Sequence, residues 1–241
     1  MNKKKLTTGI ILLATFLAVL IAIFMPWYGK GANGRDRNGL EFSDDFFNSL
    51  AKGSSNYMAD MRKVAVGFKG QTFEVQLKFK DAEVAQKAEL LYTQAGAAVE
   101  LNNQVLKIKG DMGQVMLAAI YDAEVMFHNH GDRLTAKYNL EPKAALKTWW
   151  ISFQEMDKAL KKQATPASFK QAAALIEISK RSIEPGYNFY GISPEPVSNN
   201  ILLLTFMLVF YVVYTLWYGY GVFEIFEGFG MGAEAGHKEE V

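Results

Sequence analysis

Two histidines and a carboxylate lie close together in the chain, at His128, His130 and Asp132. Imidazole and carboxylate groups are ligands for copper and zinc, and a His-x-His spacing places both rings on one side of an extended strand. The same residues also suit the end of a helix followed by a turn at Gly131 and Asp132. No second ligand cluster accompanies them, so the turn is the favoured interpretation, and a copper or zinc site is the alternative.

A second set of candidate residues lies near the C-terminus, where Tyr211, Tyr214, Thr215 and Tyr218 recur at the spacing of one helix face and Gly219 follows. Hydrocarbon offers a hydroxyl group no hydrogen-bond partner, so such a stripe inside a membrane is predicted to contact a partner helix. Tyr218 is also typical of the aromatic belt at a membrane interface, which is the alternative explanation for the lower half of the stripe.

The sequence contains two long uncharged stretches, and the second of them includes the tyrosine stripe. Residues 6–28 and 201–223 contain no charged side chain, and each is long enough for a helix to cross a hydrocarbon core of about 30 Å. Each stretch is predicted to be a transmembrane helix, which makes the lipid bilayer a partner. A cleaved secretory signal is the alternative for the first stretch, although no small-residue cleavage site closes it before Pro26.

The flanking charges predict an orientation. Residues 1–5 contain three lysines, which favours a cytoplasmic N-terminus by the positive-inside rule. Residues 224–241, an acidic and glycine-rich tail, are then also cytoplasmic. The central residues are predicted to lie on the periplasmic side of a bacterial cytoplasmic membrane.

The central residues predict an α+β domain. Residues 29–70 are expected to be a linker with a short helix that starts near Ser43. Residues 71–140 show the order strand, helix, strand, strand, helix, strand, with the last strand at residues 134–138. This is the ferredoxin-like βαββαβ order.

Two further segments complete the expected organisation. The middle hairpin is predicted to turn at Asn102-Asn103 and to pair Val99 with Leu106. Residues 141–184 predict a helical hairpin, and residues 185–200 an irregular membrane-proximal segment. The predicted fold class is therefore an α+β membrane protein, with two transmembrane helices flanking a ferredoxin-like soluble domain that carries an added helical hairpin.

Composition excludes several classes of function. The formal net charge is +1 without a basic field, which argues against a nucleic-acid partner, and no cysteine is present for disulfides, thiolate zinc or iron–sulfur clusters. No cofactor is expected beyond copper or zinc. The leading hypothesis is a non-catalytic accessory or structural subunit that docks to other integral membrane subunits. An extracytoplasmic sensor or metal-handling module is the alternative, and an enzyme ranks third because acid and base residues show no grouping.

Overall fold

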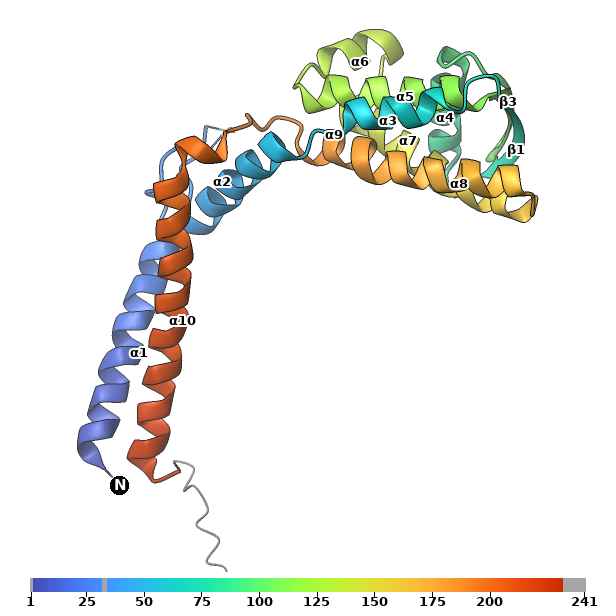
Figure 1. Cartoon of the computed structure of the whole chain (residues 1–241). Helices are drawn as coiled ribbons and strands as arrows, with labels where there is room; N and C mark the ends of the chain where they lie inside the picture. Colours follow the sequence, from blue (N-terminus) through green and yellow to red (C-terminus); the bar gives the residue numbers. More distant parts are fainter. Residues whose placement is uncertain (1, 32–33, 232–241) are drawn as a thin grey trace, which may run out of the picture. The chain divides into compact units, whose positions relative to one another are not determined.

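The computed structural model describes residues 2–31 and 34–231 and divides into two compact units (Figure 1). We call them the hairpin unit, residues 1–50 and 195–241, and the domain unit, residues 51–194. The described part is mostly helical, with one small sheet and two helices that are long and apolar enough to cross a membrane.

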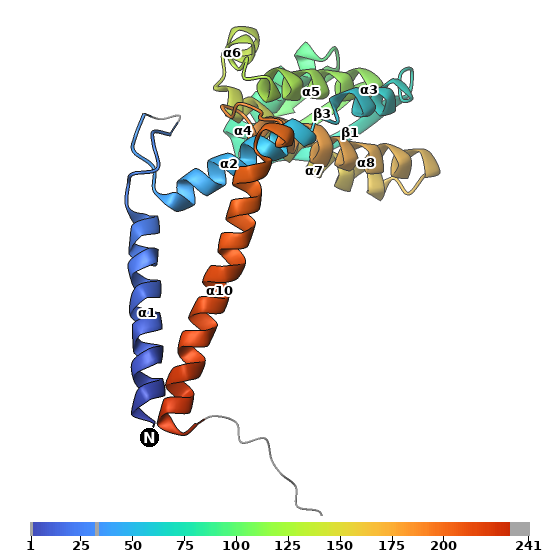
Figure 2. The same cartoon turned by 60° about the vertical axis from the view of Figure 1, so that its left-hand side comes forward.

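The hairpin unit contains the two candidate spanning helices, α1 (Lys3–Phe24) and α10 (Ile201–Phe229). Almost none of their apolar length is buried, so they are not the core helices of a soluble fold. They run antiparallel, and the start of α1 meets the end of α10 in both views (Figures 1 and 2). Part of the predicted tail belongs to α10, while residues 232–241 lie outside the described residues.

The linker between α1 and the domain unit holds more helix than predicted. Helix α2 (Gly39–Ser54) begins before Ser43, because the side chains of Asn38 and Glu41 each bond the backbone amide of the other, at 2.9 and 3.0 Å. This reciprocal arrangement satisfies two of the free amides at the helix start. A further short helix, α3 (Met58–Val66), was not predicted.

The domain unit packs helices against one face of a three-stranded antiparallel sheet with strand order β1-β3-β2. On β1, Phe73, Val75 and Leu77 are buried while the alternate residues are exposed, the pattern of a strand with one buried face. The elements are β1 (Thr72–Lys78), α4 (Ala82–Gln94), β2 (Ala98–Asn102), β3 (Val105–Asp111), α5 (Met112–Phe127), α6 (Asp132–Tyr138), α7 (Pro142–Lys162), α8 (Pro166–Ile178), η1 (Ser179–Ile183) and α9 (Glu184–Asn188).

The predicted register of the middle hairpin is wrong by two residues. Val99 pairs with Ile108 instead of Leu106, and Leu101 pairs with Leu106. The turn lies one residue further along the chain, because Asn103 takes the left-handed conformation with φ 53°. A shift of two residues keeps every side chain on the same face, so the hydrophobic pattern could not distinguish the two registers.

The predicted fourth strand at residues 134–138 is also wrong, because this segment is helix α6. With three strands, the ferredoxin-like fold is not confirmed. The physical reason lies at its end, where the adjacent residues Lys137 and Tyr138 both bond the carboxylate of Asp122. Neighbouring side chains point to opposite faces of a strand, so only a helical turn brings both to one carboxylate.

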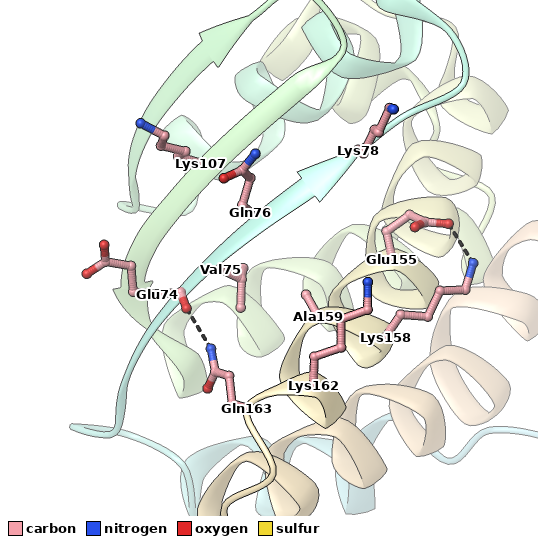
Figure 3. A pocket seen from close by; sticks show the side chains of 10 residues that line it. All are labelled: Glu74, Val75, Gln76, Lys78, Lys107, Glu155, Lys158, Ala159, Lys162 and Gln163. Atoms are coloured by element: carbon pink, nitrogen blue, oxygen red, sulfur yellow. Dashed lines mark hydrogen bonds and ion pairs between the residues drawn. The ribbon is translucent and has the colours of Figure 1, made fainter.

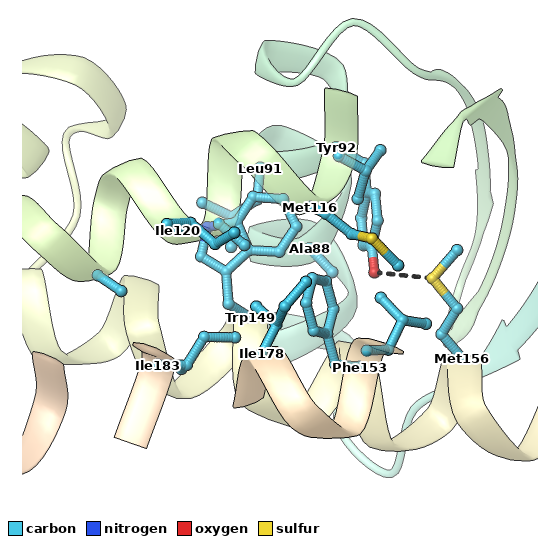
Figure 4. Packing of buried hydrophobic residues seen from close by; sticks show 14 of the residues in the cluster. Ala88, Leu91, Tyr92, Met116, Ile120, Trp149, Phe153, Met156, Ile178 and Ile183 are labelled. Atoms are coloured by element: carbon cyan, nitrogen blue, oxygen red, sulfur yellow. Dashed lines mark hydrogen bonds between the residues drawn. The ribbon is translucent and has the colours of Figure 1, made fainter. Parts of the chain in front are cut away.

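Helix α7 lies at the centre of the core. Its residues Trp149, Phe153 and Met156 are fully buried and pack against α4 and α5 (Figure 4). Tyr92 of α4 meets the Trp149 ring edge-on at 5.1 Å, and its hydroxyl lies 3.7 Å from the sulfur of Met156. Burial of each large side chain contributes about 1.5–3 kcal/mol, so α7 organises the hydrophobic core.

The helical hairpin of α7 and α8 is confirmed, with one irregularity. Thr165 and Ser168 form the N-terminal capping box of α8. The end of α8 widens into the π-helical turn η1, where the amide of Glu184 bonds the carbonyl of Ser179. Pro185 explains this turn, because proline has no amide and its ring clashes with the carbonyl four residues earlier.

Candidate functional site

The predicted metal ligands lie in the turn between α5 and α6. His128 caps the end of α5, the amide of His130 donates to the carbonyl of Val125 at 2.9 Å, and Asp132 begins α6. All three side chains are exposed. Over residues 2–31 and 34–231, no three His, Asp or Glu side chains are grouped as metal ligands. The geometry is that of a helix end and turn, and metal binding by these residues stays a prediction.

The residue between the two histidines has a structural role that the sequence did not indicate. Asn129 is left-handed with φ 63°, and its Oδ1 accepts hydrogen bonds from the amide of Gly191 at 2.7 Å and from Lys52 Nζ at 3.1 Å. Its Nδ2 donates to the carbonyl of Ile192 at 2.9 Å. The loop therefore fixes the segment that follows α9.

Lys52 completes this arrangement from the end of α2. It is 2% exposed, and Nζ also donates to the carbonyls of Phe189 at 3.0 Å and Ile192 at 2.5 Å. Burial lowers its pKa, because the charged form loses hydration. Its acceptors are neutral oxygens, and the ring of Phe127 lies 5.2 Å away.

A buried carboxylate joins three helices. Asp122 of α5 is fully buried, and its Oδ2 accepts hydrogen bonds from Tyr138 Oη at 2.6 Å and Trp149 Nε1 at 2.8 Å. Lys137 Nζ donates to Oδ1 at 3.0 Å. Burial, and then the negative charge of Asp122, raise the pKa of Tyr138 well above its ordinary value near 10. Every oxygen of the carboxylate has a partner, so the cluster is suited to holding α6 and α7 on α5.

Only part of the tyrosine stripe of α10 contacts α1, among the described residues. Tyr214 stacks on Phe16 of α1 at 4.3 Å between ring centroids and donates to the Phe16 carbonyl at 3.3 Å, and the ring of Tyr218 lies 5.2 Å from Phe16. Tyr211 is 68% exposed, and a side chain at Gly219 would meet open space. The hydroxyl of Thr215 bonds the Tyr211 carbonyl at 2.8 Å within the helix itself.

Close contacts between the two candidate spanning helices also occur at glycines that lie outside the predicted stripe. A Cβ at Gly9 would lie 2.7 Å from Ile225, and a Cβ at Gly228 would lie 2.8 Å from the amide of Leu6. Small residues permit such close backbone approach in membrane helices. Lys5, near the start of α1, also pairs with Glu227, near the end of α10.

Two concavities of the domain unit lie beside α7. One, of about 520 Å³, lies between β1 and the second half of α7. The other, of about 360 Å³, lies between α7 and α9 and is lined by Leu146, Trp150 and Tyr187 among others. The indole Nε1 of Trp150 donates to Glu184 at 3.0 Å on its rim.

The described chain thus defines a class: a mostly helical protein with a small three-stranded sheet and two candidate membrane-spanning helices. No protein-family model, curated protein or solved structure matches it.

Proposed function

We propose that this protein is a non-catalytic accessory subunit of a larger membrane complex. Helices α1 and α10 anchor it as a hairpin in the bilayer, and α10 docks to the helices of other subunits. The domain unit supplies an interaction surface outside the membrane. The close glycine contacts between α1 and α10 support the anchor, because they allow the hairpin to form within one chain.

One observation carries the docking proposal. Tyr214 uses its hydroxyl on α1, whereas Tyr211, one helix turn earlier, is 68% exposed and its hydroxyl has no partner among the described residues. A hydroxyl inside hydrocarbon is costly without an acceptor. A helix of another subunit would supply both the acceptor and the packing surface.

The proposed location is a bacterial cytoplasmic membrane, with the domain unit on the periplasmic side. The three lysines at residues 3–5 support this orientation, since lysine and arginine favour the cytoplasmic side of a span. The pair between Lys5 and Glu227 would then lie at the cytoplasmic end of the hairpin.

The test is the native mass of the tagged full-length chain after extraction from its own membrane with mild detergent. We expect a particle much larger than the 27.0 kDa chain in its micelle. Tyr211→Phe removes only the exposed hydroxyl and should weaken the complex by about threefold to thirtyfold, the range of interhelical hydrogen bonds of about 0.6–2 kcal/mol. Tyr214→Phe, the same chemical change facing α1, is the matched control. A monomer at every detergent level would refute the proposal.

A second candidate function is an extracytoplasmic sensor of a small molecule, and the cavity between α7 and α9 favours it. Its volume of about 360 Å³ and its aromatic lining suit a small ligand. Ligand binding there should raise the melting temperature of the wild type and leave that of Trp150→Ala unchanged. For the metal-handling version, equal copper and zinc content in the wild type and in a His128→Ala/His130→Ala variant would dismiss it.

A further inference from the structure

One of the two edges of the sheet, that of β1, lies beside a groove. In the order β1-β3-β2, strand β1 pairs on one side with β3. On its other side, across the cavity of about 520 Å³, lies the second half of α7 (Figure 3). Sheet edges are templates for another extended chain, and natural proteins usually block them. The edge of β1 is blocked if its outward amides and carbonyls already have hydrogen-bond partners.

The hydrogen-bond phase of β1 shows which backbone groups face the groove. The carbonyl of Gln71 accepts from the Met112 amide at 2.9 Å, and the amide of Phe79 donates to the Gln104 carbonyl at 2.8 Å. Both pairs continue the register of β1 with β3. Hydrogen-bonded positions alternate along an antiparallel strand, so the odd-numbered residues bond β3 and the even-numbered residues direct their amides and carbonyls to the groove.

Only one of these edge groups has a partner in the part of the chain that the structure describes. The carbonyl of Glu74 accepts a hydrogen bond from Gln163 Nε2 at 2.8 Å, which Figure 3 shows across the end of the groove. In the described residues the edge amides of Gln76 and Lys78 donate no hydrogen bond, and their carbonyls accept none. A single side-chain amide therefore caps one end of the edge, and the rest is open to pairing.

The charge of the groove selects the kind of chain that could pair. Four lysines line it against two glutamates. Both glutamates are already paired with lysines: Glu155 with Lys158 at 2.7 Å, and Glu74 with Lys109 at 3.3 Å. In the described residues no carboxylate pairs with Lys78 on β1 or Lys162 on α7, and these two ammonium groups leave the groove positive.

We infer that the free edge of β1 is a docking site for an extended acidic peptide of a partner protein, which adds a fourth strand beside β1 and places its carboxylates near Lys78 and Lys162. Main-chain hydrogen bonds supply affinity in this mode, and the side chains supply selectivity. A second copy of this chain fits less well, because the same set of lysines would then lie on both sides of the new strand pair. The inference rests on the proposed function only in treating the domain unit as an interaction surface.

The test measures binding of fluorescent peptides of about eight residues to the full-length chain in mild detergent, by polarisation. One peptide alternates glutamate with valine. A second has the same sequence with alternate amides N-methylated, which blocks strand pairing without changing charge, and a third has lysine in place of glutamate. We expect the first to bind and the other two to bind at least about tenfold more weakly, since each tenfold step is about 1.4 kcal/mol.

Two variants test the groove from the side of the protein. Gln76→Pro removes an amide that faces the groove and leaves the ladder with β3 intact, as proline does on edge strands. Lys78→Glu/Lys162→Glu reverses the two unpaired charges and leaves the backbone alone, so it remains informative if the proline variant fails to fold. Both should weaken binding at least about tenfold, whereas Lys170→Glu, outside the groove on α8, should not.

Several results would overturn the inference. The first two are binding of the N-methylated peptide, or of the lysine peptide, that is as tight as binding of the glutamate–valine peptide. The others are peptide binding that is unchanged by charge reversal, and a dimer of this chain that Gln76→Pro dissociates. The native-mass experiment is independent of these measurements. A chain that binds the peptide but is monomeric in its own membrane refutes the accessory-subunit proposal alone, and an unresponsive groove in a large complex refutes the strand-docking inference alone.

Discussion

Replacement of Asp122 should be among the most damaging single changes in the domain unit. In Asp122→Ala, the hydroxyl of Tyr138 and the indole N–H of Trp149 lose their acceptor, and both residues are almost fully buried. Each unsatisfied buried donor costs about 1–3 kcal/mol. The expected loss is therefore about 3–5 kcal/mol, comparable with breaking a buried ion pair. This is a large share of an ordinary domain stability of about 5–15 kcal/mol.

The assay is thermal unfolding of the full-length chain in mild detergent, followed by near-ultraviolet circular dichroism, which reports the packing around Trp149. The melting temperature of Asp122→Ala should fall by roughly 10–20 °C, on a scale of a few degrees per kcal/mol for a domain of this size. Asp60→Ala is the control, since Asp60 is exposed and forms its ion pair with Lys63 in the next helix turn; it should stay within about 0.5 kcal/mol.

A double-mutant cycle tests the mechanism and not only the size of the effect. With Tyr138→Phe already in place, the hydroxyl that Asp122→Ala would strand is gone, so the second substitution should cost less than it does in the wild type. Strictly additive costs, or a loss below about 1 kcal/mol for Asp122→Ala, would refute the reasoning that the carboxylate holds these helices together.

Three further predictions concern Asn129, Gly228 and Tyr138. Asn129→Gly keeps the left-handed backbone accessible but removes the side-chain acceptor, so the amide of Gly191 should exchange hydrogen faster by mass spectrometry; unchanged exchange would contradict the anchoring role. Gly228→Leu should separate α1 from α10, whereas Gly219→Leu, whose added side chain meets open space, should not. The chain has no cysteine, so thiols introduced on the facing sides of the two helices report the separation by cross-linking. Equal cross-linking in both variants would count against the observed packing. Because the pKa of Tyr138 is raised in the folded state, the stability that this hydroxyl contributes is complete below pH 10 and is lost as the pH rises beyond that value. Between about pH 10 and 11.5, the melting temperature of Tyr138→Phe should therefore fall less steeply than that of the wild type. Parallel declines in melting temperature would exclude the effect.

Helix positions in the domain unit were predictable because their signals are local. Asp81, Asp111 and Thr165 each accept a hydrogen bond from an amide in the first turn of the helix that follows, and Pro142 and Pro166 occupy first-turn positions. A capping side chain needs only the amides two or three residues away, so no tertiary contact decides it. The strand at β1 was equally clear, since one buried face alternates with one exposed face.

The failures occur where a distant partner decides. Residues 134–138 alternate in polarity as a strand would, yet they fold as α6, and the carboxylate that Lys137 and Tyr138 both bond lies on α5. Sequence spacing between α5 and α6 does not reveal that the three groups meet. The only local indication was an acidic residue at Asp122 on the otherwise apolar face of α5, a position where an aspartate must find donors if it is buried.

The two candidate spanning helices show the same division between composition and contact. Apolar length alone predicted both helices, because crossing hydrocarbon requires nothing else of the sequence. Apolar length does not identify the face of each helix that contacts the other. The predicted stripe included Tyr211 and Gly219, which do not meet α1, as well as Tyr214, which does. Gly9 and Gly228 lie outside the stripe, and their missing side chains let the backbones approach. Between apolar helices in lipid the hydrophobic effect no longer selects a face, so residue size and hydrogen bonding decide. Tyr211 is 68% exposed, and its hydroxyl has no partner among the described residues, so its own helix pair gives no reason for a hydroxyl at this position.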